Sequence, residues 1–139
     1  MGYVLTDMSV TIGGTTVSSF IRSADVQMSV EDVDLTAMGA TSRNHGAGLR
    51  DDRLTLEAFS DYTAVTGLDA VLNPLLGSST GATVVVKPTS AAASSTNPSY
   101  TMVGVLFEYH PIQGEVGAAA MTPVTFLPAA GSKWTRATT

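Results

Sequence analysis

The chain has 139 residues, of which 44% are hydrophobic and 14% are charged, with a net charge of −5 and no cysteine. Soluble domains carry about 25% charged residues, so this composition indicates a membrane protein or a subunit whose surface is covered by neighbours. A spanning helix needs roughly 20 mainly apolar residues, whereas the longest charge-free stretch, 88–107, is rich in Ser, Thr, Asn, Gly and Pro. We therefore expect no membrane association. Scattered basic residues and no thiol disfavour tight nucleic-acid binding and cysteine chemistry.

Two alternating runs near the N-terminus predict strands. Apolar and polar residues alternate over 4–12, which is typical of a half-buried strand, and glycines 13–14 then predict a tight hairpin turn. A second alternating run covers 24–30. Beyond it the apolar positions slip by one residue, beginning at Val33, so we expect a bulge or bend near 31–32.

Residues 38–52 follow neither a helical nor a strand pattern. They hold three glycines among mostly polar side chains, and we interpret them as a long loop. Loops of this length are usually functional or disordered.

The middle of the chain predicts a strand over 53–59 and one helix over 62–76. Ser and Asp at 60–61 are suitable N-cap residues, Gly77 is placed as a C-cap, and Pro74 is expected to bend the last turn. The apolar stripe of this helix comprises Val65, Leu68, Val71, Leu72, Leu75 and Leu76.

The remaining sequence predicts a short β-branched strand over 83–87, a loop over 90–99, a hairpin of strands 100–110 and 115–127, and a short final strand over 133–137. About seven strands with one helix predict a mainly β domain, a β-sandwich or open barrel with one flanking α-helix. We expect residues 1–139 to form a single domain of this kind.

Candidate catalytic and metal-binding groups are sparse. His45 and His110 accompany no known motif, and the adjacent carboxylates at 51–52 point to opposite faces of a strand, so a solvated or salt-bridged role is expected. Two carboxylates of the cluster at 31–34 could converge on a cation, although a solvated role is preferred. Trp134 is either a packing anchor, the preferred interpretation, or a ligand-stacking residue. We expect neither an enzyme nor a bound cofactor.

Assembly with copies of itself fits the composition better. A short β chain with this apolar content has strand faces and edges that need cover, and exposed edges aggregate unless they are paired. A closed ring of subunits pairs them. A monomeric small-molecule-binding sandwich is the rival interpretation from composition alone.

Several short segments, in this order and spacing, add a resemblance to a known family. They are VDLT at 33–36, GLRDD at 48–52 before LTLE at 54–57, DY at 61–62, NP at 97–98, GEVG at 114–117 and FLPAAG at 126–131. Together they resemble the tail tube (major tail) proteins of long-tailed bacteriophages over nearly the whole chain.

The resemblance implies a virion protein of the phage tail, made in the host cytoplasm. Six copies would form a ring, and rings would stack around the tape measure protein, contact other tail proteins and pass double-stranded DNA through the lumen without tight binding. A capsid decoration or head–tail joining protein is the alternative.

The resemblance also implies two sets of site residues. The long loop of the family contacts the adjacent ring, and its counterparts here are Met38, Gly39, Arg43, Asn44, His45, Gly46, Gly48, Leu49, Arg50 and Asp51. A polar, acidic lining repels phosphate, and the expected lumen-facing residues are Asp25, Gln27, Ser29, Glu31 and Glu57.

Overall fold

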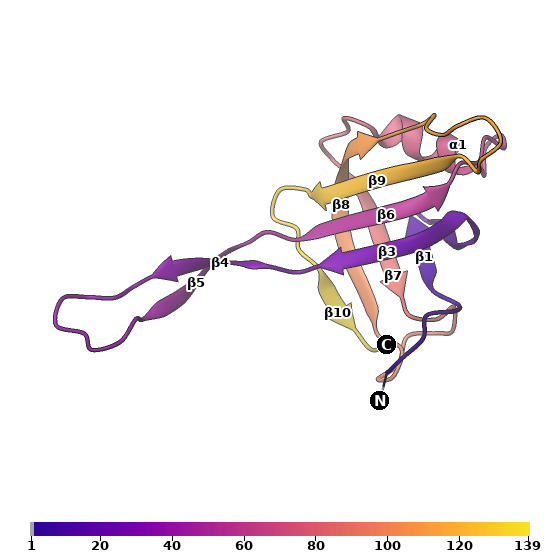
Figure 1. Cartoon of the computed structure of the whole chain (residues 1–139). Coiled ribbons are helices and arrows are strands. Elements are labelled where there is room, and N and C mark those ends of the chain that lie inside the picture. The colour runs from indigo at the N-terminus through magenta and orange to yellow at the C-terminus, as the bar shows by residue number, and fades with distance from the viewer. Residues whose placement is uncertain (1) are drawn as a thin grey trace.

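Figure 1 shows the computed structural model, which describes residues 2–139 as a body built on a curled sheet with a narrow arm extending from it. The body strands are β1 (Ser9–Ile12), β2 (Thr15–Thr16), β3 (Ile21–Gln27), β6 (Arg53–Phe59), β7 (Ala82–Lys87), β8 (Ser99–Tyr109), β9 (Met121–Pro128) and β10 (Thr135–Ala137). The arm strands are β4 (Val30–Asp34) and β5 (His45–Arg50). The helical elements are α1 (Leu68–Leu72) and the 3-10 turns η1 (Ser18–Phe20) and η2 (Asn73–Leu75).

The body sheet runs in the order β2-β1-β7-β8-β9-β6-β3, with every neighbouring pair antiparallel. β8 is its longest strand and changes partner along its length. Its first residues pair with β10, with Thr101 opposite Thr135, whereas its second half pairs with β9, with Gly104 opposite Pro128. This change of partner places the C-terminal segment beside β8, next to the end of β9.

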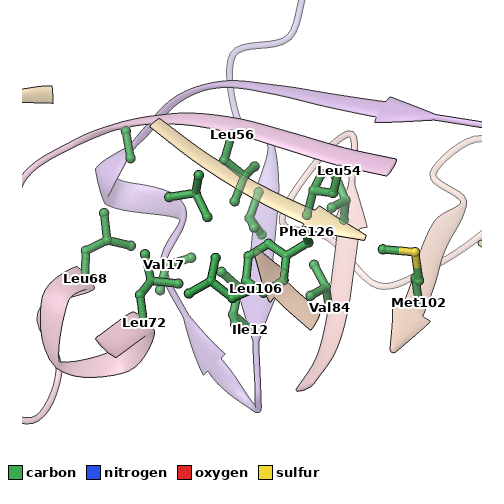
Figure 2. Close-up of a cluster of buried hydrophobic side chains, with 14 of the residues drawn as sticks. Ile12, Val17, Leu54, Leu56, Leu68, Leu72, Val84, Met102, Leu106 and Phe126 are labelled. Atoms are coloured by element: carbon green, nitrogen blue, oxygen red, sulfur yellow. The ribbon is translucent and has the colours of Figure 1, made fainter. Parts of the chain in front are cut away.

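One hydrophobic core joins distant strands of the sheet order. Leu54, Leu56 and Ala58 alternate along β6 and are at most 1% exposed, and they share a cluster with Ile12 of β1 and Phe126 of β9. Figure 2 shows Leu54, Leu56, Ile12 and Phe126 converging between the strands. Because β1 and β6 lie far apart in the sheet order, the sheet must curl over on itself. The expected mainly β sandwich or open barrel with a flanking helix is confirmed.

The helix α1 closes one opening of this barrel. Leu68 and Leu72 project from it toward the strands and are buried (Figure 2). The hydroxyl of Tyr109 on β8 donates a hydrogen bond to the carboxylate of Asp69. Burial, with the hydrogen bond and the negative charge of Asp69, raises the pKa of Tyr109, so the phenol remains a hydrogen-bond donor. This hydrogen bond joins α1 to β8.

The predicted helical span 62–76 is wrong over its first half. Asp61 accepts hydrogen bonds from the backbone N and Oγ1 of Thr63 and thereby forms a turn. Val65 then takes φ = 70°, which no right-handed helix contains, and the helix begins after Gly67. Within residues 2–139, no helix is long and apolar enough to cross a membrane.

Two strand predictions are also too long. β1 begins only at Ser9, because the preceding segment makes just an isolated bridge between Asp7 and Thr89 and the Asp7 carboxylate accepts from the N–H and hydroxyl of Ser90. Likewise β9 begins at Met121, and residues 111–120 form a fully exposed loop. The hairpin turn at 13–14 is confirmed, with both glycines at positive φ and Ile12 opposite Thr15. Ten strands are present in residues 2–139 where about seven were predicted, partly because the arm contributes its own pair.

The backbone at Val65 generates a stability prediction. A β-branched residue in the left-handed region costs about 1–2 kcal/mol, whereas Asn tolerates that region. Since Val65 is 84% exposed, its replacement loses little burial. We expect Val65→Asn to raise the free energy of unfolding in urea by about 0.5–1 kcal/mol. Val65→Ala, which keeps a Cβ, should change it little, and equal stability of the Asn and Ala variants would contradict the strained turn.

Candidate assembly interface

The most prominent surface feature is the arm, which we define as residues 28–52. It leaves the body where β3 ends and β6 begins and projects away from the sheet (Figure 1). Its strands pair antiparallel, with Val33 opposite Gly46 and Asp34 opposite His45. Every residue of β4 is exposed. The arm is therefore a two-stranded ribbon without a covering layer.

The arm confirms one sequence prediction and corrects another. The register between β4 and β5 shifts between Val30 and Asp32, which confirms the bulge expected near 31–32. The interpretation of 38–52 as a loop is wrong for its second half, because residues 45–50 form β5. Glycines at alternate positions of β5 hide the period-2 pattern by which strands are recognised.

On one side of the arm, the apolar side chains of β4 and the turn after it pack closely against glycines of β5. A Cβ placed on Gly48 would lie 2.9 Å from Cγ2 of Val33 and 3.2 Å from the carbonyl oxygen of Glu31, and one placed on Gly46 would lie 2.6 Å from Cδ1 of Leu35. The two glycines therefore make room for the valine and leucine side chains. Val33 and Leu35 remain 36% and 56% exposed, so this side of the ribbon presents apolar surface to solvent.

The other side of the arm carries polar contacts across the ribbon, one of them an ion pair. Nδ1 of His45 lies 2.8 Å from Oδ1 of Asp32, and Nη1 of Arg43 donates to Oδ2 of Asp34 at 3.1 Å. Hydrogen bonds from Thr36, with a smaller contribution from Arg43, hold the pKa of Asp34 below its ordinary value. The arm contains five acidic and two basic residues, a net charge of −3 within the total of −5. Most of the excess negative charge of the protein therefore lies on this ribbon.

The structure brings all the predicted inter-ring residues onto the arm. Met38 is fully exposed in the turn and Leu49 on β5 is 79% exposed. Sequence reasoning missed Val33 and Leu35 as members of this surface, although their alternation with Asp32 and Asp34 was the available signal. Met38 and Gly39 lie in the turn, Arg43 and Asn44 precede β5, His45, Gly46, Gly48, Leu49 and Arg50 lie on β5, and Asp51 follows it.

The predicted lumen-facing residues divide between two places. Asp25 and Gln27 on β3 lie on the same exposed face as Glu57 on β6, as the pairing of Asp25 with Thr55 and the alternate burial of both strands require. The other two predicted residues, Ser29 and Glu31, lie on the arm, beyond the end of β3.

This exposed face of β3 and β6 also carries positive charge. Nη1 of Arg22 lies 3.9 Å from Oε1 of Glu57, and Arg53 is paired opposite Gln27. Two acidic residues therefore accompany two basic ones, and the face is polar but nearly neutral. Arg53 shares this face through the alternation of β6 itself, whereas Arg22 reaches Glu57 only because the register of β3 shifts between Ile21 and Ser23.

A second apolar surface lies on the body, along the outer side of β8. A groove of about 480 Å³ lies between the loop after η2 and the end of β9, and Phe107 on its wall is 62% exposed. Its lining has no charged residue and comprises Leu76, Gly77, Ser79, Val105, Leu106, Phe107, Pro128, Ala129 and Ala130. The arm and this groove both present apolar side chains that the chain itself does not cover.

The root of the arm is built on a buried carboxylate. Asp52 is 0% exposed, and its oxygens accept from Nε and Nη2 of Arg50 at 3.1 and 2.7 Å and from the backbone N–H of Trp134 at 2.8 Å. Burial alone raises the pKa of Asp52, but the hydrogen bonds from Arg50 and Trp134 outweigh it and lower the pKa below 3.8. The expected salt-bridged role of Asp52 and the packing role of Trp134, which is 3% exposed, match this geometry.

Comparisons with known proteins bear on the fold. No family model and no curated sequence matches the chain. A chain in the virion of a native gene transfer agent particle superimposes with a TM-score of 0.71 at 13% identity, covering 93% of this chain and 95% of that one. The fold is tail-tube-like. A chain of the PVC sheath–tube complex, an extracellular contractile injection system in its extended state, gives 0.69 at 10% identity, covering 96% and 89%. A chain of the PVC sheath/tube terminator gives 0.71 at 10%, covering 99% and 97%.

These superpositions establish a shared tail-tube-like fold, and at 10–13% identity they establish nothing finer. The resemblance noted from the sequence is confirmed at that level. The arm is the most distinctive surface of the chain.

The buried carboxylate at the arm root generates a pH prediction. Since the pKa of Asp52 is lower in the folded state, its stabilising effect is present above the unfolded value of 3.8 and is lost as the pH falls through the folded pKa. We expect Asp52→Asn to lower the free energy of unfolding by about 2 kcal/mol at pH 7. The difference in unfolding free energy between wild type and variant should shrink below about pH 4, because Asp52 itself then becomes protonated. The other carboxylates are common to both proteins and cancel in this comparison. A difference that stays constant down to pH 2 would contradict this role.

Proposed function

We propose that this protein is the self-assembling structural subunit of a phage-like tail tube, forming six-fold rings that stack into a conduit for DNA. The single observation that carries the proposal is the arm on a tail-tube-like body. A lone two-stranded hairpin is marginally stable in water, and this one exposes Val33, Leu35, Met38 and Leu49. Such a ribbon gains its stability when another molecule covers it.

The arm is suited to the contact between stacked rings. It projects beyond the sheet, so its apolar residues can reach a copy that does not border the same body (Figure 1). The Arg43–Asp34 ion pair and the His45–Asp32 contact stiffen the opposite side and keep that side solvated. In this proposal the inter-ring contact uses Met38 and Leu49 together with Val33 and Leu35, and the uncharged groove beside β8 supplies further apolar surface for assembly.

The exposed face of β3 and β6 is proposed to line the lumen. A lining that mixes Asp25 and Glu57 with Arg22 and Arg53 carries little net charge, so it offers phosphate no concentrated positive patch to bind. The net charge of −5 per subunit adds a general repulsion. Such a channel would hold the tape measure protein during assembly and let double-stranded DNA slide afterwards. Adjoining tail proteins would cap the stack.

Microscopy and sedimentation of the purified protein test this proposal through the arm. We expect wild-type protein to form rings and tubes in negative stain. Gly48→Ala should raise the concentration needed for tubes about tenfold, equivalent to about 1.4 kcal/mol, because its Cβ would press on the backbone oxygen of Glu31. Gly46→Ala should cost less, since only the flexible end of Leu35 must move.

Failure of the wild type to assemble at any concentration would contradict the proposal. Particles that bind phage heads and never form tubes would favour the alternative, a capsid decoration or head–tail joining protein. Single rings that do not stack would favour a tube terminator.

Charge reversal tests the assignment of the lumen. We expect the double variant Asp25→Lys and Glu57→Lys to form tubes but to slow DNA ejection several-fold at low salt, because the added cations bind phosphate. The loss should diminish as salt is raised. Reversal of Glu108 and Glu115, which lie off this face, is the matched control. Ejection at the wild-type rate through intact variant tubes would contradict the assignment.

A further inference from the structure

The arm is joined to the body by very few interactions. It connects covalently only where β3 leads into it and where it leads into β6. At its root, the N–H of Asp51 donates to the carbonyl oxygen of Ser29 at 2.9 Å, and the hydroxyl of Ser29 donates to the carbonyl oxygen of Asp51. These bonds hold the two sides of the ribbon together and continue the pairing of β3 with β6, which ends at Gln27 opposite Arg53, but they do not join the ribbon to any other element of the body.

One hydrogen bond within residues 2–139 crosses from the arm to the rest of the protein. It runs from the backbone N–H of Trp134 to Oδ2 of Asp52, at 2.8 Å. Arg50, two residues earlier on β5, donates hydrogen bonds to both oxygens of the same carboxylate. The last arm strand is therefore tied through one buried group to the C-terminal segment.

The C-terminal segment is itself anchored on the body. The indole Nε1 of Trp134 donates to the carbonyl oxygen of Arg53 at 3.2 Å, and its ring is buried in the core cluster. Two residues before it, the hydroxyl of Ser132 accepts from the N–H of Val103 on β8 at 2.9 Å. After it, β10 pairs with β8. A continuous chain of contacts thus runs from β8 through the C-terminal segment and Asp52 to the arm.

We propose that Asp52, held by Arg50 and Trp134, is a positioning residue that sets the direction of the arm, so that the C-terminal strand prepares the subunit for assembly. The inference rests on the proposed function in one respect, that the arm makes the contact between rings. A ribbon hinged only at residues 28–29 and 51 would sample many directions, and docking would have to restrict them. Fixing the direction of the arm in the free subunit lowers the conformational entropy that is lost on docking.

The absence of native cysteine allows the direction of the arm to be measured in the free subunit. Spin labels on cysteines introduced at Thr41, near the arm tip, and Thr83, an exposed position on β7, report the distance between arm and body. Below the concentration of assembly, we expect one narrow distance distribution for wild type and a distribution at least twice as wide for Asp52→Asn. Asp51→Asn makes the same charge change at the neighbouring residue and should remain narrow.

Folding is checked separately, by cooperative urea unfolding of each variant. Should Asp52→Asn fail to fold, Arg50→Gln removes the guanidinium and keeps the bond from Trp134 to Asp52, and it should also widen the distribution. A distribution as narrow as wild type in the folded variant overturns the inference.

Assembly is then measured on the same variants, with Asp61→Asn as a charge-matched control on the body. We expect Asp52→Asn to raise the concentration needed for tubes about tenfold, and Asp61→Asn to leave it unchanged. A widened distribution with wild-type assembly would overturn the positioning role. If wild type itself never assembles while Asp52→Asn still widens the distribution, the proposed function fails and the link between Asp52 and arm direction stands.

Discussion

The buried carboxylate of Asp52 links the exposed arm to the body and to the C-terminal segment. Burying Asp52 is unfavourable unless every oxygen is satisfied, and Arg50 and Trp134 satisfy both. Because these hydrogen bonds form only while the arm, the start of β6 and the C-terminal segment meet in one arrangement, the buried carboxylate favours that arrangement over others. The body folds around its own core, and in our proposal the direction of the arm is set at this residue.

The body and the arm divide the physical tasks of a subunit. The curled sheet buries its apolar face on itself and on α1, and it needs no partner for that. The arm has the opposite character, since glycines on β5 let Val33 and Leu35 lie flat across the ribbon while nothing covers them. A stable core that carries an uncovered ribbon is suited to assembly, because the subunit folds first and its remaining apolar surface is hidden only when copies meet.

Sequence periodicity predicted the features that depend on local pattern. The alternation of β6, the two-glycine turn and the slip of frame after Val30 all appear where they were expected, whereas the alternation predicted for β8 breaks at a register shift between Leu106 and Glu108. The failures arise from interactions that a local pattern does not contain. Val65 interrupts an apparently helical stripe with a turn at positive φ, and a register shift in β3 brings Arg22 beside Glu57 on a face that looked acidic. Asp52 was expected to be solvated or salt-bridged, and its hydrogen bond to Trp134, 82 positions away, follows only from the tertiary fold.

We propose that copies of this protein assemble through the arm, and a cryo-electron microscopy map of the purified assembly, resolved well enough to trace side chains, would show what covers it. We expect stacked rings in which the apolar side of each arm, including Met38 and Leu49, is covered by a copy in the adjacent ring. Rings or tubes in which the arms extend freely into solvent, with contacts made only by the body, would contradict it.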